Sequence, residues 1–253
     1  MKKGYIEKVL DADLILVGIG KEFEINKYQC EEKAIEALKE LKDQLAGKNY
    51  YLITICTNSV LKKAGFPQDR IVSPCGNLEM KQCPNQCEGT LQELTESEKE
   101  QVTKMVNDSV EPMFEPCPIC GERMVLNNVY AEKYDENGYL DAWKYYTKWL
   151  QGTINKKLCI LELGVDLTFP SIIRWPFEKV AYYNQKATFI RVNENLYHMT
   201  EELKDKGISV AKNAIDWLLE KEIKKHKRIG KWMQKALFHY IAKKNGCKKP
   251  VAL

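Results

Sequence analysis

Two pairs of closely spaced cysteines are the residues of this sequence best suited to chemistry. Cys83 and Cys87 form a C-x3-C pattern, and Cys117 and Cys120 form a C-x2-C pattern followed by Gly121. Four thiolates that arrive as two close pairs suit a tetrahedral zinc ion, and neither pair contains a histidine or a carboxylate. The spacing predicts a structural rather than a catalytic zinc site; the alternative is four unrelated cysteines.

A second candidate is the segment Gly18-Ile19-Gly20, which follows a short apolar run. Glycines after a strand let the backbone approach a pyrophosphate, so this is half of a dinucleotide-binding pattern. The third glycine is missing, because Phe23 stands in its place, and Glu22 and Glu24 put acidic groups where an anion would lie. An ordinary turn from strand to loop is therefore an equal alternative.

Strands alternate with helices along most of the chain and would position these residues. Apolar runs predict buried strands near residues 12–17, 50–55, 159–163 and 187–192, and a helical repeat predicts a helix over 34–45. This alternation is typical of an α/β fold with a parallel, Rossmann-like sheet covered on both faces.

The alternation of strands and helices is interrupted between residues 73 and 121, where no apolar run predicts a buried strand. One amphipathic helix is expected there: Thr95 and Glu98 form a capping box at its start. Its apolar face consists of Val102, Met105, Val106 and Val110. We therefore expect a small zinc-binding domain of residues 76–120 inserted into a Rossmann-like domain of residues 1–75 and 121–218.

Residues 219–253 form a basic tail with an expected amphipathic helix. The tail has eleven Lys or Arg and two Glu, a charge of +9, which leaves −5 for the first 218 residues of a chain of net charge +4. Its lysines indicate an acidic partner, nucleic acid or an anionic membrane surface. The alternative is a helix docked on the domain with a solvated lysine face.

Composition excludes several classes of protein. The chain has 253 residues, of which 44% are hydrophobic and 29% charged, as in an ordinary folded domain. Its apolar runs are too short for a membrane span, and its first residues lack a signal-peptide core. Nine cysteines without an export signal favour a reducing compartment, so we expect a cytoplasmic protein.

Three segments in order give the sequence a family resemblance. They are residues 55–66, then Cys75-Gly76 followed by the two cysteine pairs, then residues 161–170 with Val192-Asn193 further on. Together they resemble the sirtuins, NAD-dependent protein deacylases and ADP-ribosyltransferases, and most of all the divergent bacterial group linked to macrodomain proteins. The resemblance implies a Rossmann-like domain with an inserted zinc domain and an NAD cleft between them.

The resemblance also implies roles for single residues. Asn58, preceded by Thr57, matches the asparagine that positions the nicotinamide ribose and a water. Asn193 matches an asparagine that contacts the adenosine ribose. The residues implied to contact NAD are Gly18, Gly20, Thr57, Asn58, Gly164, Val165 and Asn193, and the implied zinc ligands are Cys83, Cys87, Cys117 and Cys120. Without the resemblance, Asn58 would be an ordinary turn former at a strand end.

The departures from the family pattern bear on activity. Residues 21–28 lack the family's serine and its Gly-Ile-Pro-Asp-Phe-Arg segment, Val60 replaces an aspartate, and Cys75 replaces the catalytic histidine. The family histidine acts as a base on a ribose hydroxyl in deacylation, and a cysteine with an ordinary pKa near 8.5 is mostly protonated at neutral pH. Asn58 and Cys75 are the candidate catalytic residues, although Cys75 also suits a small half-buried position near the zinc.

Three functions follow from this pattern. The first is NAD-dependent ADP-ribosyl transfer to a protein acceptor, or NAD cleavage, with deacylation disfavoured. The second is a catalytically silent module that binds NAD or ADP-ribose, or a partner protein. In the third, the NAD cleft no longer binds a ligand, and the inserted zinc domain carries the function.

Overall fold

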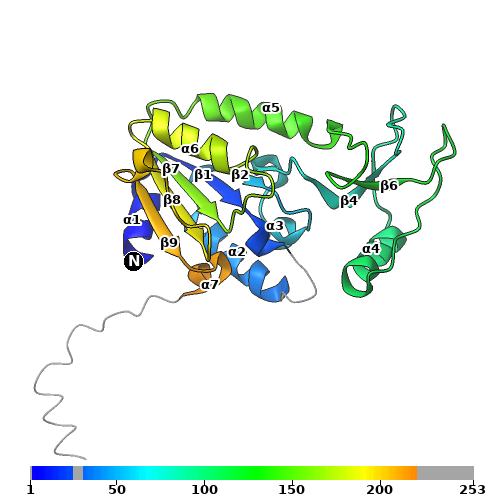
Figure 1. Cartoon of the computed structure of the whole chain (residues 1–253), viewed down its shortest axis with the longest axis horizontal. Helices are drawn as coiled ribbons and strands as arrows, with labels where there is room; N and C mark the ends of the chain where they lie inside the picture. Colours follow the sequence, from blue (N-terminus) through cyan, green and yellow to red (C-terminus); the bar gives the residue numbers. More distant parts are fainter. Residues whose placement is uncertain (1, 25–30, 221–253) are drawn as a thin grey trace, which may run out of the picture. The chain divides into compact units, whose positions relative to one another are not determined.

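Six parallel strands form the central sheet of the computed structural model, which describes residues 2–24 and 31–220 (Figure 1). The strands lie in the order β3-β2-β1-β7-β8-β9, and each neighbouring pair is parallel. The predicted α/β fold is therefore confirmed. The strands are β1 Leu14–Ile19, β2 Asn49–Thr54, β3 Ile71–Val72, β7 Leu158–Leu163, β8 Thr188–Asn193 and β9 Gly207–Ala211.

Helices cover both faces of this sheet, as Figure 1 shows. Side chains alternate along β1, so that Ile15 and Val17 join the core under α1, α2, α3 and α7, whereas Leu16 joins the core under α5 and α6. Burial on both faces explains why the central strands β1, β2, β7 and β8 are mostly apolar. The helices are α1 Lys2–Asp11, α2 Glu31–Gln44, α3 Val60–Lys63, α5 Asn137–Gln151, α6 Arg174–Tyr183 and α7 Ala214–Leu219, with short 3-10 turns at Lys21–Phe23, Gln68–Arg70 and Glu201–Leu203.

The order of strands reverses next to β1. The chain continues from β1 to β2 and β3 on one side, and it returns through β7, β8 and β9 on the other. Loops that leave the carboxyl ends of β1 and β7 therefore diverge, which is where open α/β sheets place their ligands. The candidate residues at these strand ends are brought to one edge by this topology.

A second, antiparallel sheet belongs to the inserted region, with the order β5-β4-β6. Its strands are β4 Gly76–Gln82, β5 Gln92–Glu93 and β6 Val125–Asn128. The sequence pattern did not predict β4, because the middle of this strand is only half-buried and carries no regular apolar alternation. Since β6 pairs with β4, the small sheet includes residues beyond position 120, where we expected the insertion to end.

Helix α4, Glu96–Asp108, packs its buried Val102 into the core of the small domain. The predicted capping box is confirmed: Thr95 Oγ1 accepts from the Glu98 amide, and the Glu98 carboxylate accepts from the Thr95 amide at 2.9 Å. The other carboxylate oxygen of Glu98 lies 2.5 Å from Lys81 Nζ on β4, a buried ion pair that ties the helix to the sheet. Val110 lies beyond the end of the helix and is exposed, so its expected place on the apolar face was wrong.

The basic tail lies outside the described residues, except for its first two positions, Leu219 and Glu220. Within residues 2–24 and 31–220, no helix combines the length and the apolar character needed to cross a bilayer.

Candidate NAD cleft and zinc centre

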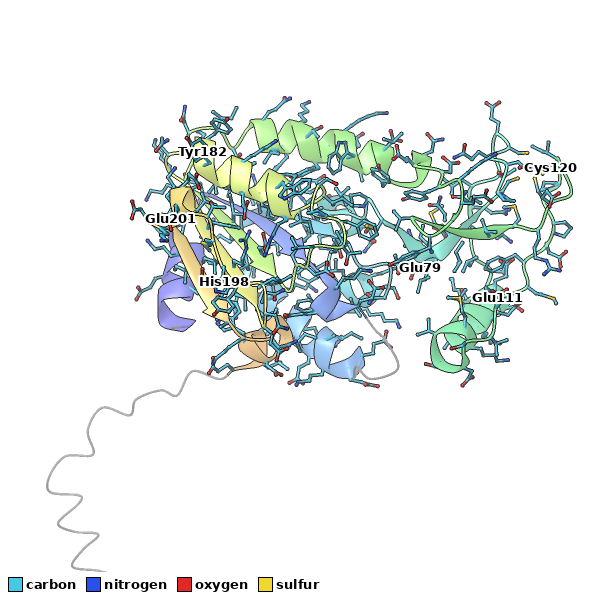
Figure 2. The ribbon with its side chains drawn as sticks, viewed as in Figure 1. Glu79, Glu111, Cys120, Tyr182, His198 and Glu201 are labelled. Carbon is cyan, nitrogen blue, oxygen red and sulfur yellow. The ribbon has the colours of Figure 1, made fainter. Side chains whose placement is uncertain are left out.

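The two cysteine pairs meet in the small domain. The four Sγ atoms all lie within 4.8 Å of one another, and those of Cys83 and Cys120 are 3.4 Å apart. Figure 2 shows Cys120 among the loops at the end of the small domain. The structure therefore brings together the four cysteines predicted as zinc ligands, Cys83, Cys87, Cys117 and Cys120, in a cluster that could hold a metal ion.

The backbone around the sulfurs has the form of a zinc knuckle. The amide of Asn85 donates to Cys83 Sγ at 3.3 Å, and the amide of Ile119 donates to Cys117 Sγ at 3.4 Å. Gly121 has a φ of +76°, a conformation that glycine adopts without strain and that the tight turn after the second pair requires. These donors stabilise thiolates, because they point at the negative charge.

The pKa of Cys120 supports the same conclusion. A hydrogen bond from the Glu122 backbone and another from the Asn85 side chain lower the pKa of Cys120 to about 6, whereas desolvation and the neighbouring thiols raise the pKa of Cys87 to about 12, so that Cys120 is the first of these two thiols to ionise. A thiolate is the form that binds zinc. The donor set therefore fits a tetrahedral Zn²⁺ with all four positions taken by protein sulfur, as in structural rather than catalytic sites.

The residues expected to contact NAD meet at the carboxyl edge of the large sheet. The strands that carry them are adjacent, because β1 pairs with β2 on one side and with β7 on the other, and β7 pairs with β8. By strand, they are Gly18 and Gly20 at the end of β1, Thr57 and Asn58 after β2, Gly164 and Val165 after β7, and Asn193 at the end of β8.

The glycines of this edge are explained by close packing within the chain. A Cβ atom on Gly18 would lie 2.6 Å from Cγ2 of Ile173, at the start of α6. A Cβ atom on Gly20 would overlap the backbone of Gly164 and Val165. Gly18 therefore lets β1 approach the start of α6, and Gly20 lets the end of β1 approach the loop after β7, whether or not a phosphate binds there.

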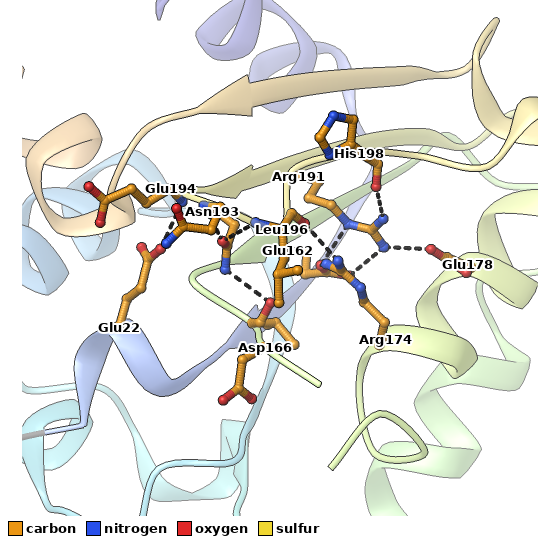
Figure 3. Close-up of polar contacts among 12 residues, drawn as sticks. Glu22, Glu162, Asp166, Arg174, Glu178, Arg191, Asn193, Glu194, Leu196 and His198 are labelled. Atoms are coloured by element: carbon orange, nitrogen blue, oxygen red, sulfur yellow. Dashed lines mark hydrogen bonds and ion pairs between the residues drawn. The ribbon is translucent and has the colours of Figure 1, made fainter. Parts of the chain in front are cut away.

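Gly164 is different, because its open side faces the acidic residue Glu22. Its φ is +62°, and a Cβ atom there would lie 2.5 Å from the Cβ atom of Glu22. The carboxylate of Glu22 accepts a hydrogen bond from the backbone amide of Glu194 at 2.9 Å (Figure 3). It accepts a second from the backbone amide of Ala214 at 2.5 Å. Burial raises the pKa of Glu22, while the two amides act in the opposite direction.

The same turn of chain engages the residues after β2. Glu24 accepts from the Thr57 amide at 3.1 Å and from Thr57 Oγ1 at 2.8 Å. Asn58 donates from Nδ2 to the carbonyl oxygen of Phe23 at 2.9 Å. Lys21 donates to Glu24 at 3.0 Å. We call residues 20–24 the closing turn, because its polar groups are bonded to the loops after β2, β7 and β8.

The contacts of the closing turn leave no room for NAD at this edge of the sheet. The cradle beside Gly164 is filled by Glu22, and the polar groups of Thr57 and Asn58 are bonded to the closing turn. The residues present are those that the resemblance implies, but in this conformation they do not accommodate the cofactor.

Cys75 lies next to the start of β4 and is fully buried. Desolvation raises the pKa of its thiol to about 12, against a smaller opposite effect of the Lys21 ammonium. The thiol is therefore protonated at neutral pH and has no general-base character. Its backbone carbonyl accepts from the Val129 amide at 3.0 Å, which joins the two ends of the insertion.

Asn193 organises the loop that follows β8. Its Nδ2 donates to the Val165 carbonyl at 3.1 Å, and its Oδ1 accepts from the amides of Asn195, at 2.9 Å, and Leu196, at 2.6 Å. The side chain therefore joins the loop after β7 to the loop after β8, which is a positioning role for both loops.

A buried ion network lies beneath that loop, and sequence reasoning missed it. Glu162 on β7 is fully buried and pairs with Arg191 Nε at 2.7 Å and with Arg174 Nη1 at 2.5 Å (Figure 3). The two arginines also donate to the carbonyls of Leu196 and His198, each at 2.6 Å. A charged residue inside each of two otherwise apolar strands, Glu162 in β7 and Arg191 in β8, was the available signal.

A groove of about 810 Å³ begins beside Thr57 and continues along the small domain. Asn128 and Tyr130 line its polar part, and Met124 and Phe114 belong to its apolar part. Tyr130 accepts a hydrogen bond from Lys21 at 3.2 Å, so the groove borders the closing turn.

Comparisons with known proteins agree with the resemblance. No protein-family model matches the chain. The chain is 23% identical over 180 residues to "Protein ADP-ribosyltransferase" of Staphylococcus aureus, covering 68% of this chain and 56% of the relative. It is 24% identical over 172 residues to "Probable bifunctional ADP-ribose hydrolase/ADP-ribosyltransferase" of Fusarium oxysporum f. sp. cubense, covering 64% of this chain and 29% of the relative. The chain thus spans about half of the first relative and less of the second.

Solved sirtuin structures have the same fold. One, concerned with sirtuin substrate affinity, superposes with a TM-score of 0.53 at 14% identity, over 87% of this chain and 96% of that one. A Sir2 homologue–NAD complex superposes with a TM-score of 0.53 at 12% identity, over 86% and 91%. The chain has the sirtuin fold, and the predicted likeness to a divergent sirtuin-like ADP-ribosyltransferase group is confirmed.

Proposed function

We propose that this chain is a sirtuin-type protein that binds NAD and transfers its ADP-ribosyl group to an acceptor protein. The observation that carries the proposal is the meeting of the loops after β1, β2, β7 and β8 at one edge of a sirtuin fold. That edge is where α/β sheets bind ligands. The names of the curated relatives support the same class of reaction.

Transfer is favoured over deacylation by the state of Cys75. Deacylation in the family pattern needs a base at this position, and burial keeps the Cys75 thiol protonated at neutral pH. General-base help is worth roughly 10²–10⁴-fold in rate, so its loss is severe. ADP-ribosyl transfer needs less from the chain, because the acceptor brings its own nucleophile.

The acceptor would bind along the groove beside Thr57. The groove reaches from the candidate site to the small domain, and both polar and apolar side chains line it. The zinc centre has a structural role in this proposal, since it holds the two loops that end the small domain. None of the seven described cysteines is in a disulfide, and four of them are the proposed zinc ligands, which suits a reducing compartment such as the cytoplasm.

A second candidate function is a silent module that binds NAD or ADP-ribose, or a partner protein. The bonds of the closing turn to Thr57, Asn58 and the loop after β8 favour it, because they use the groups that a cofactor would need.

Calorimetric titration of the zinc-loaded chain with NAD, and separately with ADP-ribose, tests both candidates. We expect saturable NAD binding that is about tenfold weaker in Asn58→Ala, which corresponds to one hydrogen bond of about 1.4 kcal/mol. Asn137→Ala, at an exposed helix start, is the matched control and should bind as the unmodified chain does. Release of nicotinamide should also decrease in Asn58→Ala.

Other outcomes would change the conclusion. Tight ADP-ribose binding without nicotinamide release would support the silent module over the transferase. Absence of heat with either ligand, in a folded chain that holds zinc, would contradict the transferase and the nucleotide-binding module, and would leave only a module that binds a partner protein.

A further inference from the structure

The closing turn, residues 20–24, is hydrogen-bonded to the loops after β2, β7 and β8 at the candidate site. Besides the bonds of its side chains, its backbone donates from Gly20 to Leu163 at 2.9 Å and from Glu22 to Gly164 at 3.2 Å. Phe23, which belongs to the turn, is fully buried. The turn is therefore an ordered part of the fold rather than a loop that rests on the surface.

The two acidic residues of the closing turn, Glu22 and Glu24, bond to different segments of the site. Glu22 accepts from the amide of Glu194, after β8, and from the amide of Ala214, at the start of α7, whereas Glu24 accepts from Thr57, after β2. A carboxylate withdrawn from water requires polar partners: Glu22 has two backbone amides from distant residues, and Glu24 has the amide and hydroxyl of Thr57 and the ammonium of Lys21. The two carboxylates thus satisfy donors at both ends of the expected cleft.

A negatively charged nucleotide cannot share this space with two carboxylates. The Glu22 side chain fills the open side of Gly164, and a phosphate there would also meet its charge at close range. Binding of such a ligand requires the turn to give up its bonds. The affinity is then reduced by the fraction of molecules in which the turn is open.

We infer that the closing turn is an autoinhibitory element of this chain, in which the Glu22 side chain occupies the nucleotide cleft beside Gly164 and Glu24 holds the turn to Thr57, so that NAD or ADP-ribose binds only when the turn gives up these contacts. The inference rests on the proposed function, because it assigns a nucleotide to the same edge of the sheet. It adds that the chain's own acidic side chains, rather than the loss of a catalytic group, set the affinity.

Three variants separate the effects of volume, charge and position. Glu22→Ala empties the space beside Gly164, Glu22→Gln keeps the volume and removes the charge, and Glu24→Gln weakens the bonds to Thr57. Glu201→Gln removes a carboxylate from an exposed ion pair with Lys204 and is the control. Urea unfolding of each zinc-loaded variant verifies that it folds.

Hydrogen exchange measures the contacts without any ligand. We expect the amides of Glu194 and Ala214 to exchange about tenfold faster in Glu22→Ala than in the unmodified chain, with Thr57 unchanged. In Glu24→Gln we expect the Thr57 amide to exchange faster, with the amides of Glu194 and Ala214 unchanged. Unchanged exchange in both variants would overturn the inference, because the carboxylates would then not hold the turn.

Calorimetry with NAD and with ADP-ribose measures the consequence. We expect Glu22→Ala to bind at least one of them about tenfold or more tightly than the unmodified chain, and Glu22→Gln to lie between the two. Equal binding by the unmodified chain and Glu22→Ala would overturn the inference and leave the proposed function intact. No binding by any variant, with exchange confirming an open turn, would overturn the proposed function and this inference with it.

Discussion

The buried ion network around Glu162 is predicted to hold the loop after β8, because its two arginines donate to carbonyl groups of that loop. Substitution of Glu162 tests this prediction. Its fully buried carboxylate accepts three hydrogen bonds, from Arg174 Nη1 at 2.5 Å and from Arg191 Nε and Nη2 at 2.7 and 3.1 Å. Glu162→Gln keeps the side-chain volume but leaves two buried guanidinium groups without their main counter-charge. Removal of one partner from a buried ion pair costs about 3–5 kcal/mol. Arg191 keeps Glu178, so we expect a loss of about 3 kcal/mol in the free energy of unfolding.

Urea unfolding of the zinc-loaded chain measures this loss, and Glu178→Gln is the matched control. The Glu178 side chain is 22% exposed and makes one ion pair, with Arg191, so its loss should cost less than about 1 kcal/mol. The reasoning would be refuted if Glu162→Gln cost as little as Glu178→Gln. Equal and large losses would also count against it, because the counter-charge of Arg191 would then not come mainly from Glu162.

Three further predictions concern the zinc, the buried thiol and the tail. Chelation or Cys117→Ser should loosen the small domain and release near-stoichiometric zinc, measured by elemental analysis; a purified chain without zinc would contradict the site. Because burial raises the pKa of Cys75 to about 12, its contribution to stability is present at neutral pH and decreases as the pH rises above about 8.5, where the unfolded thiol ionises. Alkylation of Cys75 in the folded chain should therefore stay slow between pH 7 and 9, as followed by mass spectrometry, and rapid labelling would show an ionised thiol. Retention on heparin should be lost when residues 228–253 are deleted, and no retention at low salt would exclude a role of the tail in binding polyanions.

The large sheet could be predicted from the sequence because its strands are buried on both faces. Burial makes each central strand an apolar run with clear ends, and the runs near residues 50–55 and 159–163 match β2 and β7 to within a residue. The run near residues 12–17 begins two residues before β1 and stops short of its end, because Gly18 interrupts the apolar pattern inside the strand.

The small domain was less predictable, for a physical reason. Its core is a handful of residues around the zinc ligands, so its strands have little apolar surface to mark them. The cysteine spacing nevertheless predicted that these four side chains come together, because close pairs of cysteines are a local pattern that the sequence records directly. Pairing of β6 with β4 depends on contacts between segments more than forty residues apart and leaves no local pattern.

At the candidate cleft, the sequence indicated that acidic residues lie where a phosphate was expected, but not how these residues are bonded. Glu22 and Glu24 were evident as acidic residues where a phosphate was expected, yet their partners are remote: Glu22 is 172 residues from Glu194 and 192 from Ala214. Only the folded chain shows that these carboxylates bond to the loops of the site.

The glycines of the cleft illustrate why such motifs are ambiguous. A phosphate and a neighbouring backbone both require the missing side chain, so the pattern after β1 is the same for either. In this chain Gly18 and Gly20 are accounted for by packing against α6 and the loop after β7, and only Gly164 has its open side toward a group that a ligand could replace. A substitution at Gly20 would therefore disturb the fold whether or not NAD binds, whereas Glu22→Ala changes the cleft and leaves that packing intact. The position that can distinguish a working cofactor site from a vestigial one is the acidic residue, not the glycine motif.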